Sequence, residues 1–238
     1  EIGPFDLFGV TVNPTFHWYG LLIVSGIIAA AAVAAWMAKR DDKDPDHVWN
    51  GLIWVVVLAV VFARVWHVLF PSVSSEYDTS WYLSHFFDMN KGPLIIWSGG
   101  LSIFGAVIGG ALGVLLYTLK NKLEIKSWLD IAAVVVPLGQ AIGRWGNYVN
   151  EELYGKPTDL PWGIEISNPD PRYLGETSFH PLFLYESIWN LLLFGTLLYV
   201  WLRFRDRFKQ GDFVLLYLVG YLIARFFLEF LRIEVAKV

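Results

Sequence analysis

Six long stretches of predominantly apolar residues, separated by polar connectors, dominate the hydropathy pattern of the 238-residue sequence. A helix rises 1.5 Å per residue, so about 20 residues cross a hydrocarbon core about 30 Å thick. A transmembrane barrel would instead show segments of about 10 residues with alternating hydrophobicity. The pattern therefore predicts an all-α polytopic membrane protein that forms one integral membrane domain over residues 1–238. The six predicted transmembrane helices cover residues 17–38, 48–70, 94–118, 128–147, 182–202 and 213–232.

The connectors differ in length and in charge. Those after the first, third and fifth spans are short and basic, whereas those after the second and fourth spans are longer and contain Pro, Gly and aromatic residues. Ten Lys and Arg residues fall on the side of the short connectors, four fall on the other side, and four lie within spans or at their edges. Because basic residues are retained in the cytoplasm, we expect the N-terminus and the long loops to lie outside. The outer loops 71–93 and 148–181 would then form a small extracytoplasmic head.

Composition narrows the chemistry further. The chain is 55% hydrophobic and 17% charged, which is too apolar for a soluble domain of this length. It contains no Cys, which excludes disulfides and a cysteine nucleophile of its own. The sequence has no metal-ligand spacing, dinucleotide fingerprint or long basic run, so we expect no metal, no cofactor and no nucleic-acid partner. The chain begins with Glu, which indicates an incomplete N-terminus, and its first residues do not form a signal-peptide pattern.

The predicted orientation places polar residues of every span near one level, the outer interface. An ionisable group at membrane depth costs about 3 kcal/mol on insertion scales, so several at one depth indicate a function. Arg225, Glu229 and Arg232 are spaced to share one helix face, as are Arg64 and His67. The inner halves of the spans carry few polar groups, which argues against a transporter with a site at the midplane. The polar residues at the outer level include His17, Tyr19, Arg64, His67, Gly99, Gly100, Arg144, Asn147, Arg225, Glu229 and Arg232.

Simpler interpretations exist for several of these residues. Arg232 alone is typical of an arginine whose side chain extends to the headgroups. Arg225 and Glu229 could be an ion pair that only fixes helix packing. His17 and Tyr19 could be interfacial anchors. Taken together, however, two or three arginines with amides and glycines match an oxyanion, and the phosphate available at that depth belongs to a phospholipid. The residues alone thus predict a protein that acts on phospholipids of the outer leaflet.

One segment allows a closer comparison. The stretch "GQAIGRWGNYVNEELYGKPT" resembles the signature of the prolipoprotein diacylglyceryl transferase family, in which G-R-x-G-N-x-x-N-x-E-x-x-G is the diagnostic pattern. Further family motifs occur in the same order along nearly the whole chain. They are "HWYG" at 17–20, "ARVWHVLF" at 63–70, "GGLSIFGA" at 99–106, "HPLFLYE" at 180–186 and "ARFFLEFLR" at 224–232.

The resemblance implies a transferase of the bacterial plasma (inner) membrane with its active site toward the outer leaflet. Members of this family transfer the diacylglyceryl group of phosphatidylglycerol to the lipobox cysteine thiol of a preprolipoprotein signal peptide, and release glycerol phosphate. Carried over by motif, Arg144 and Arg225 would hold the phosphate and stabilise its developing charge. The implied catalytic residues are Arg144, Arg225, His67, Glu152 and Tyr19. The implied substrate-binding residues are Asn147, Asn150, Gly99, Gly100, Gly155, Arg64, His17, Glu229 and Arg232.

The sequence departs from the family pattern in two respects. Many members have a histidine, proposed as the base for the thiol, at the position of Phe104. His67, or otherwise Glu152, is therefore our candidate for the base, unless proximity to the leaving phosphate suffices. The family usually has a seventh span, so the sequence is either truncated or a shorter member. These departures leave one alternative open, a catalytically altered homologue that acts as a phospholipid-binding subunit of a membrane complex.

Overall fold

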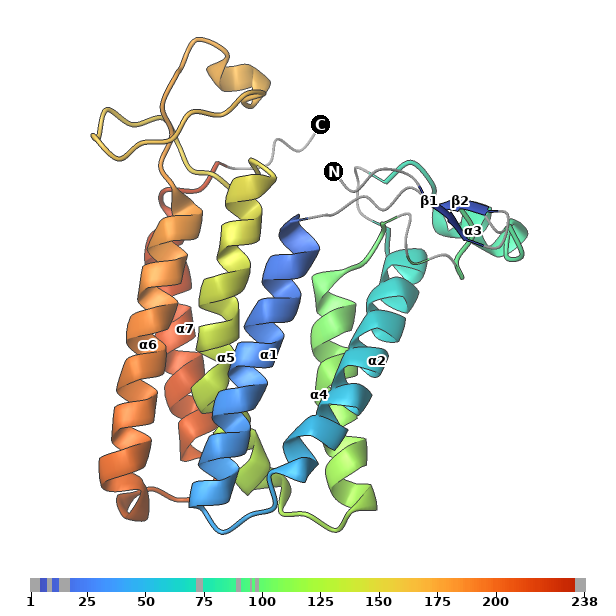
Figure 1. Cartoon of the computed structure of the whole chain (residues 1–238). Coiled ribbons are helices and arrows are strands. Elements are labelled where there is room, and N and C mark those ends of the chain that lie inside the picture. Colours follow the sequence, from blue (N-terminus) through green and yellow to red (C-terminus); the bar gives the residue numbers. More distant parts are fainter. Residues whose placement is uncertain are drawn as a thin grey trace. The chain divides into compact units, whose positions relative to one another are not determined.

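The fold of the chain is predominantly helical (Figure 1). The computed structural model describes residues 5–7, 10–12, 18–71, 75–88, 91–94, 96 and 99–233. The chain divides into two compact units, residues 1–34 with 130–238 and residues 35–129. We describe each unit by itself, and the single domain over residues 1–238 stays a prediction.

The first unit contains the following elements. An antiparallel hairpin of β1 (Phe5–Leu7) and β2 (Val10–Val12) precedes α1 (Trp18–Arg40), whose last residues belong to the second unit. Most of α5 (Ile125–Val149), α6 (Leu182–Phe204) and α7 (Asp212–Glu229) complete the helical part. The 3-10 turns η1 (Pro171–Tyr173) and η2 (Arg205–Arg207) lie in the loops before and after α6.

Two contacts between helices of the first unit lie at the start of α7 and at the middle of α1. The carboxylate of Asp130 on α5 accepts hydrogen bonds from the backbone N–H groups of Gly211 (2.7 Å) and Val214 (3.3 Å), so it caps the start of α7. Gly26 of α1 lies against the backbone of Gly139 on α5, where a side chain on Gly26 would approach the carbonyl oxygen of Gly139. Small residues of this kind allow close approach of membrane helices.

The second unit is built on α2 (Asp46–Leu69) and α4 (Ile103–Lys120), which lie side by side (Figure 1). Gly105, Gly109 and Gly113 form the contact face of α4, and a Cβ atom on any of them would overlap the backbone of α2. A short helix, α3 (Thr79–Ser84), follows α2 and is capped by the Asp78 carboxylate, which accepts from the Trp81 N–H at 2.8 Å.

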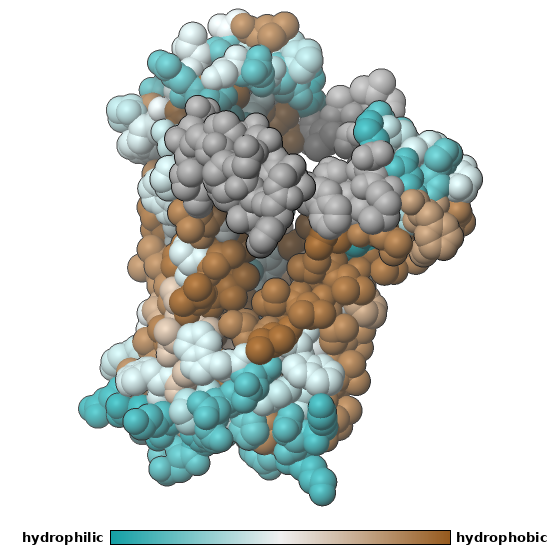
Figure 2. Space-filling model, turned by 45° about the vertical axis from the view of Figure 1, so that its right-hand side comes forward, coloured by the Kyte–Doolittle hydropathy of each residue, from teal (hydrophilic) through white to brown (hydrophobic). Residues whose placement is uncertain are grey.

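Five helical segments are long and apolar enough to cross a membrane, namely α1, α2, α4, α5 and residues 182–207, which include α6. Large apolar side chains remain exposed on the helices, for example Ile53 on α2 and Leu215 on α7, each more than 60% exposed. Figure 2 shows hydrophobic residues over the sides of the helices and hydrophilic residues at the helix ends and in the loops. This distribution suits helices surrounded by lipid, and the chain is a multi-pass helical membrane protein.

The sixth predicted span corresponds to α7, which is not among these five segments because of its charged residues. It is 18 residues long and carries three charged residues, Asp212, Arg225 and Glu229. The third predicted span also differs from the structure, because it was expected to begin at residue 94 and α4 begins at Ile103. Gly99 and Gly100 have positive φ angles of 87° and 69°, which a right-handed helix does not allow. The prediction of the helix start was therefore wrong by nine residues.

Candidate active site

The end of α5 carries the first part of the candidate site. Arg144 donates from Nη1 to the Asn147 side-chain oxygen at 3.3 Å, because the two residues lie three apart on one helix face. Asn147 is buried and donates from Nδ2 to Glu152 Oε1 at 2.8 Å, and Asn150 approaches the same oxygen at 3.5 Å. Glu152 can reach back because the chain reverses after α5, where Glu151 and Leu153 have positive φ angles.

Glu186 on α6 connects this cluster to α7. One carboxylate oxygen, Oε2, pairs with Arg144 Nη2 at 2.5 Å, and the other, Oε1, pairs with Arg225 Nη1 at 3.2 Å. The Glu186 side chain is only 9% exposed, so the pairs lie in surroundings that weaken screening by water. A single buried carboxylate therefore holds two guanidinium groups from two different helices.

The charges continue along α7 to its C-terminal end and beyond it. Arg225 Nη2 lies 3.2 Å from Glu229 Oε2, and Arg232 Nη1 lies 3.5 Å from the same oxygen. Arg225 and Glu229 thus share one face of α7 as predicted, whereas Arg232 lies beyond the end of the helix and reaches the same carboxylate from there. The Glu229 side chain is 59% exposed, so its pairs contribute little to stability.

Glycines of the signature serve close packing around these charges. Gly146 is buried, and the ring of Tyr19 from α1 occupies the space that a Cβ atom on Gly146 would need. Gly155 is also buried, and its N–H donates to the His180 carbonyl at 2.9 Å. A Cβ atom on Gly155 would approach His180 and the Leu231 carbonyl. Both positions therefore require glycine for a close approach.

Backbone hydrogen bonds connect parts of the segment 150–181 to one another and to the chain that follows α7. Lys156 N–H donates to the Leu231 carbonyl at 2.8 Å, and the fully buried Phe179 pairs with Ile164 in both directions. His180 Nδ1 lies 3.1 Å from the Tyr185 hydroxyl, which also accepts from Trp162 Nε1 at 2.9 Å. Burial lowers the pKa of His180, which favours the neutral imidazole.

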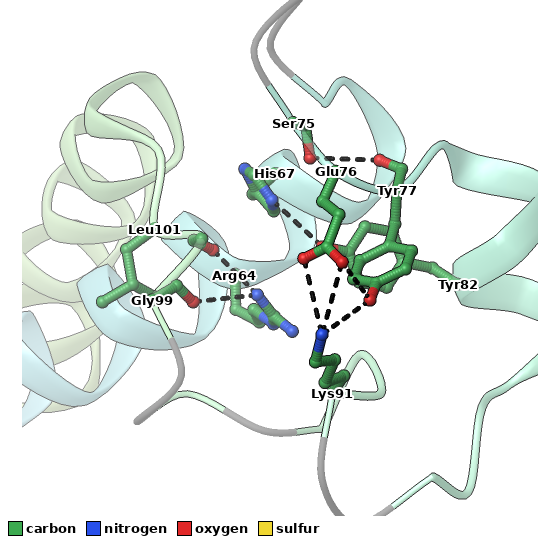
Figure 3. Close-up of a pocket in the computed structure, with 10 residues that line it drawn as sticks. Arg64, His67, Ser75, Glu76, Tyr77, Tyr82, Lys91, Gly99 and Leu101 are labelled. Carbon is green, nitrogen blue, oxygen red and sulfur yellow. Dashed lines mark hydrogen bonds and ion pairs between the residues drawn. The ribbon is translucent and has the colours of Figure 1, made fainter.

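The second unit holds the remaining described candidates around Arg64. The buried guanidinium of Arg64 donates to four backbone carbonyls, those of Gly92 (2.8 Å), Pro93 (3.0 Å), Gly99 (3.0 Å) and Gly100 (3.1 Å). Figure 3 shows the bond to Gly99. All three guanidinium nitrogens of Arg64 therefore donate to carbonyls of the loop before α4. The predicted contact of Arg64, Gly99 and Gly100 with substrate stays a prediction, and the observed contacts show Arg64 in a structural role.

A cavity of about 440 Å³ lies beside Arg64 (Figure 3). In it, Lys91 Nζ lies 2.8 Å from the Tyr77 hydroxyl and 3.3 Å from Glu76 Oε1. Hydrogen bonds from Tyr77 and Lys91 lower the pKa of the Glu76 carboxyl. His67 is half-buried, and its Nε2 lies 3.3 Å from the Tyr82 hydroxyl. The cavity is lined by Arg64, His67, Ser75, Glu76, Tyr77, Tyr82, Lys91, Gly99, Gly100 and Leu101.

The structure thus groups the sequence candidates into two sets, one in each unit. Tyr19, Arg144, Asn147, Asn150, Glu152, Gly155, Arg225, Glu229 and Arg232 belong to the first unit, and Arg64, His67, Gly99 and Gly100 belong to the second. His17 lies outside the described residues. Over the described ranges, no cluster of three or more His, Asp or Glu side chains could hold a metal ion.

The sequence analysis did not assign a role to Glu186, the central residue of the arginine pair. Two signals were present, the position of Glu186 at the end of the motif "HPLFLYE" and a carboxylate near the start of an apolar stretch, where a charged group is costly. His180 and Tyr185, in the same motif, were also left without a role.

Comparison with known proteins agrees with the motifs. A family model described as prolipoprotein diacylglyceryl transferase matches residues 7–238. A relative from Synechococcus elongatus, named phosphatidylglycerol–prolipoprotein diacylglyceryl transferase, is 37% identical over 241 aligned positions, which cover 98% of this chain and 76% of the relative. Relatives of the same name from Nostoc sp. and Chloroflexus aggregans are 36% and 38% identical, and the alignments cover 98% and 97% of this chain and 77% and 76% of the relatives.

Proposed function

Because this chain belongs to the prolipoprotein diacylglyceryl transferase family, we propose that it transfers the diacylglyceryl group of phosphatidylglycerol to the lipobox cysteine of a preprolipoprotein. The observation that carries the proposal is the pair of guanidiniums, Arg144 and Arg225, held together by Glu186 near the C-terminal ends of α5 and α7. Such a pair suits a phosphate whose lipid tails lie in the surrounding bilayer.

In the proposed reaction, the cysteine sulfur forms a bond to the carbon of the diacylglyceryl group that is joined to the phosphate oxygen. The carbon–oxygen bond breaks, and glycerol phosphate leaves with that oxygen and both electrons of the bond. The thiol gives up its proton, so the products are a thioether, glycerol phosphate and one proton. Arg144 and Arg225 act on the phosphate, because their N–H groups stabilise the negative charge that grows on it as the bond breaks.

Two residues are candidates for accepting the proton of the thiol. Glu152 lies beside the arginine pair through Asn147, which donates to it at 2.8 Å. His67 lies in the second unit at the cavity of Figure 3. We propose to separate them with the variants His67→Gln and Glu152→Gln. The variant that removes the true base should have a lipidation rate that rises with pH up to the pKa of the free thiol, near 8.5. The variant at the other residue should keep the wild-type pH profile.

We also propose the membrane arrangement that follows from the basic residues. The protein spans the bacterial inner membrane six times within this chain, with its N-terminus outside, the active site toward the outer leaflet and a head formed by the loops 71–93 and 148–181. Support comes from the ten Lys and Arg residues in the short connectors and from the network at the opposite ends of α5 and α7. The alternative of a non-catalytic lipid-binding subunit has no described contact in its favour.

The test is lipidation of a lipobox peptide in vesicles that contain phosphatidylglycerol, followed by mass spectrometry for the added diacylglyceryl group. We expect Arg144→Gln to lower the rate by at least about 10²- to 10³-fold, because it removes charged donors from the leaving phosphate. Arg172→Gln is the matched control, since Arg172 pairs with Asp170 in the outer loop at 2.9 Å and should retain full activity. Full activity of Arg144→Gln would exclude the role assigned to Arg144.

A further inference from the structure

Glu186 has a position that neither the family motif nor the reaction explains by itself. A phosphate site would bind its anion most strongly with both guanidiniums free, and yet a buried carboxylate pairs with each of them, through Oε2 to Arg144 and through Oε1 to Arg225. Burying a carboxylate is costly, and replacing ion pairs by apolar residues is often neutral for stability. The retained charge therefore calls for a functional reason.

The charges at the buried centre sum to one positive charge. Arg144 and Arg225 contribute two positive charges and Glu186 one negative charge, and the side chains of all three are less than a third exposed. Two further carboxylates, Glu152 and Glu229, are exposed at the edge of the network, where water and salt screen them. Without Glu186 the centre would carry two positive charges.

This balance distinguishes the lipid substrate from the phosphate product of the proposed reaction. A phosphodiester such as phosphatidylglycerol carries one negative charge. A phosphomonoester such as glycerol phosphate has a second pKa of about 6, so it carries close to two negative charges at neutral pH. The cost of desolvating an anion rises faster with its charge than its attraction to one positive charge does, so a buried centre with a single positive charge favours the diester. A second positive charge doubles the attraction and shifts the preference toward the departing monoester.

We propose that Glu186 is a positioning and specificity-determining residue that sets the arginine pair to one net positive charge, so that the site selects a phosphodiester monoanion and releases a phosphomonoester dianion. This inference rests on the proposed function. The guanidiniums can still bind a ligand. Their bonds to Glu186, Asn147 and Glu229 use only the terminal nitrogens, so within the described contacts the Nε–H group of each arginine remains available as a donor.

Binding without turnover tests this inference directly. We would titrate the detergent-solubilised protein with two soluble ligands at about pH 8, glycerol phosphate as the dianion and glycerophosphoglycerol, the deacylated head of phosphatidylglycerol, as the monoanion. The wild type should bind glycerophosphoglycerol more tightly. Glu186→Gln should increase the affinity for glycerol phosphate relative to glycerophosphoglycerol by about tenfold or more, because a negative charge has left the centre.

Two variants separate charge from geometry. Glu186→Asp keeps the charge on a shorter side chain and should keep the wild-type affinity ratio even if both affinities fall. Glu176→Gln removes the same charge from the exposed outer loop and should change neither affinity. A purely structural role of Glu186 would weaken both ligands together in Glu186→Gln, and that result would overturn the inference.

The wild type provides a test that does not depend on the folding of a variant. Tighter binding of glycerol phosphate than of glycerophosphoglycerol to the wild type at about pH 8 would also overturn the inference. These outcomes differ from failure of the proposed function, which would appear as no lipidation and no binding of either ligand. If the wild type lipidates the peptide but Glu186→Gln leaves the ratio of the two affinities unchanged, only the role of Glu186 is rejected.

Discussion

At the scale of single residues, the contact between Gly146 and Tyr19 links the signature on α5 to α1. The Tyr19 ring occupies the space beside Gly146, whereas no atom lies within 4 Å of a Cβ atom placed on Gly143. We expect Gly146→Ala to displace the Tyr19 ring and lower the rate of lipidation by about 10- to 100-fold, because small displacements in an active site are costly. Gly143→Ala is the matched control and should retain the wild-type rate. Equal rates for both variants would show that the position of Tyr19 does not matter.

His180 gives the outer loop a dependence on pH. Burial lowers its pKa below 6.5, so the folded loop favours the neutral ring. The neutral ring of His180 contributes fully to the stability of the closed loop above about pH 6.5. This contribution is lost as the pH falls through the lowered pKa, because the ring binds a proton more readily when the loop opens. Hydrogen exchange of residues 155–181, corrected for the intrinsic rate, should therefore show less protection at low pH.

The variant His180→Gln serves as the control for this pH effect. Glutamine does not titrate, so the protection of the loop should then vary little over the same pH range. Protection that is independent of pH in the wild type would contradict the predicted effect of His180.

The contacts of single residues also explain why the role of Glu186 was not predicted from the sequence. The helical spacing of Arg225 and Glu229 fixes their contact, because both lie on α7. The contacts of Glu186 depend on the rotation and depth of α5, α6 and α7 relative to one another, and no local spacing encodes that arrangement. Pairs within one helix were therefore predictable from the sequence, whereas the central pair of the site was not.

At the scale of elements, the packing of α2 against α4 rests on three glycines. A Cβ atom on Gly109 would overlap the Leu58 carbonyl, whereas one on Gly110 would make an ordinary contact with Val55 at 3.7 Å. We expect Gly109→Ala to lower the free energy of unfolding by about 1–3 kcal/mol, as overpacking does in well-packed cores. Gly110→Ala should leave it unchanged or raise it slightly, because alanine favours the helix. Thermal unfolding in detergent would compare the two variants, and equal melting temperatures would contradict the packing argument.

Helix positions were more predictable than helix ends. Hydropathy placed α1, α2, α5 and α6 within three residues of their observed bounds, because each ends where charged or loop-forming residues begin. It failed for the start of α4, because the apolar residues before Gly99 continue the pattern, although Gly99 and Gly100 have positive φ angles and α4 begins only at Ile103. The carbonyls of this loop bind Arg64 instead of completing a helix, and hydropathy does not register such a contact.

At the scale of the whole molecule, the absence of Cys makes the orientation directly testable. The variants Lys122→Cys, in the connector after α4, and Glu176→Cys, in the long outer loop, would each carry a single thiol. In intact spheroplasts, a membrane-impermeant maleimide should label Cys at position 176 and not at position 122, because basic connectors remain in the cytoplasm. Permeabilised cells are the control, in which both should react. The reverse pattern would contradict the predicted orientation.

Hydropathy and family motifs predicted this scale best, whereas the orientation that the charge distribution indicates stays a prediction. Five helical segments with the length and hydropathy of membrane spans confirm a multi-pass helical protein, and the motif spacing led to the family that the relatives share. Packing inside each unit was not predictable to the same degree, since it depends on side chains such as Asp130 and Glu186 that act between helices.

The contacts of Arg64 have a consequence for the loop before α4. Four carbonyl oxygens from one loop surround its single positive charge, an arrangement that many loops achieve with a bound calcium ion. Here the cation is covalently part of α2, so it cannot dissociate or be removed by a chelator. The carbonyls of Gly92, Pro93, Gly99 and Gly100 are therefore held together by a cation that stays in place whatever metal ions the surrounding solution contains.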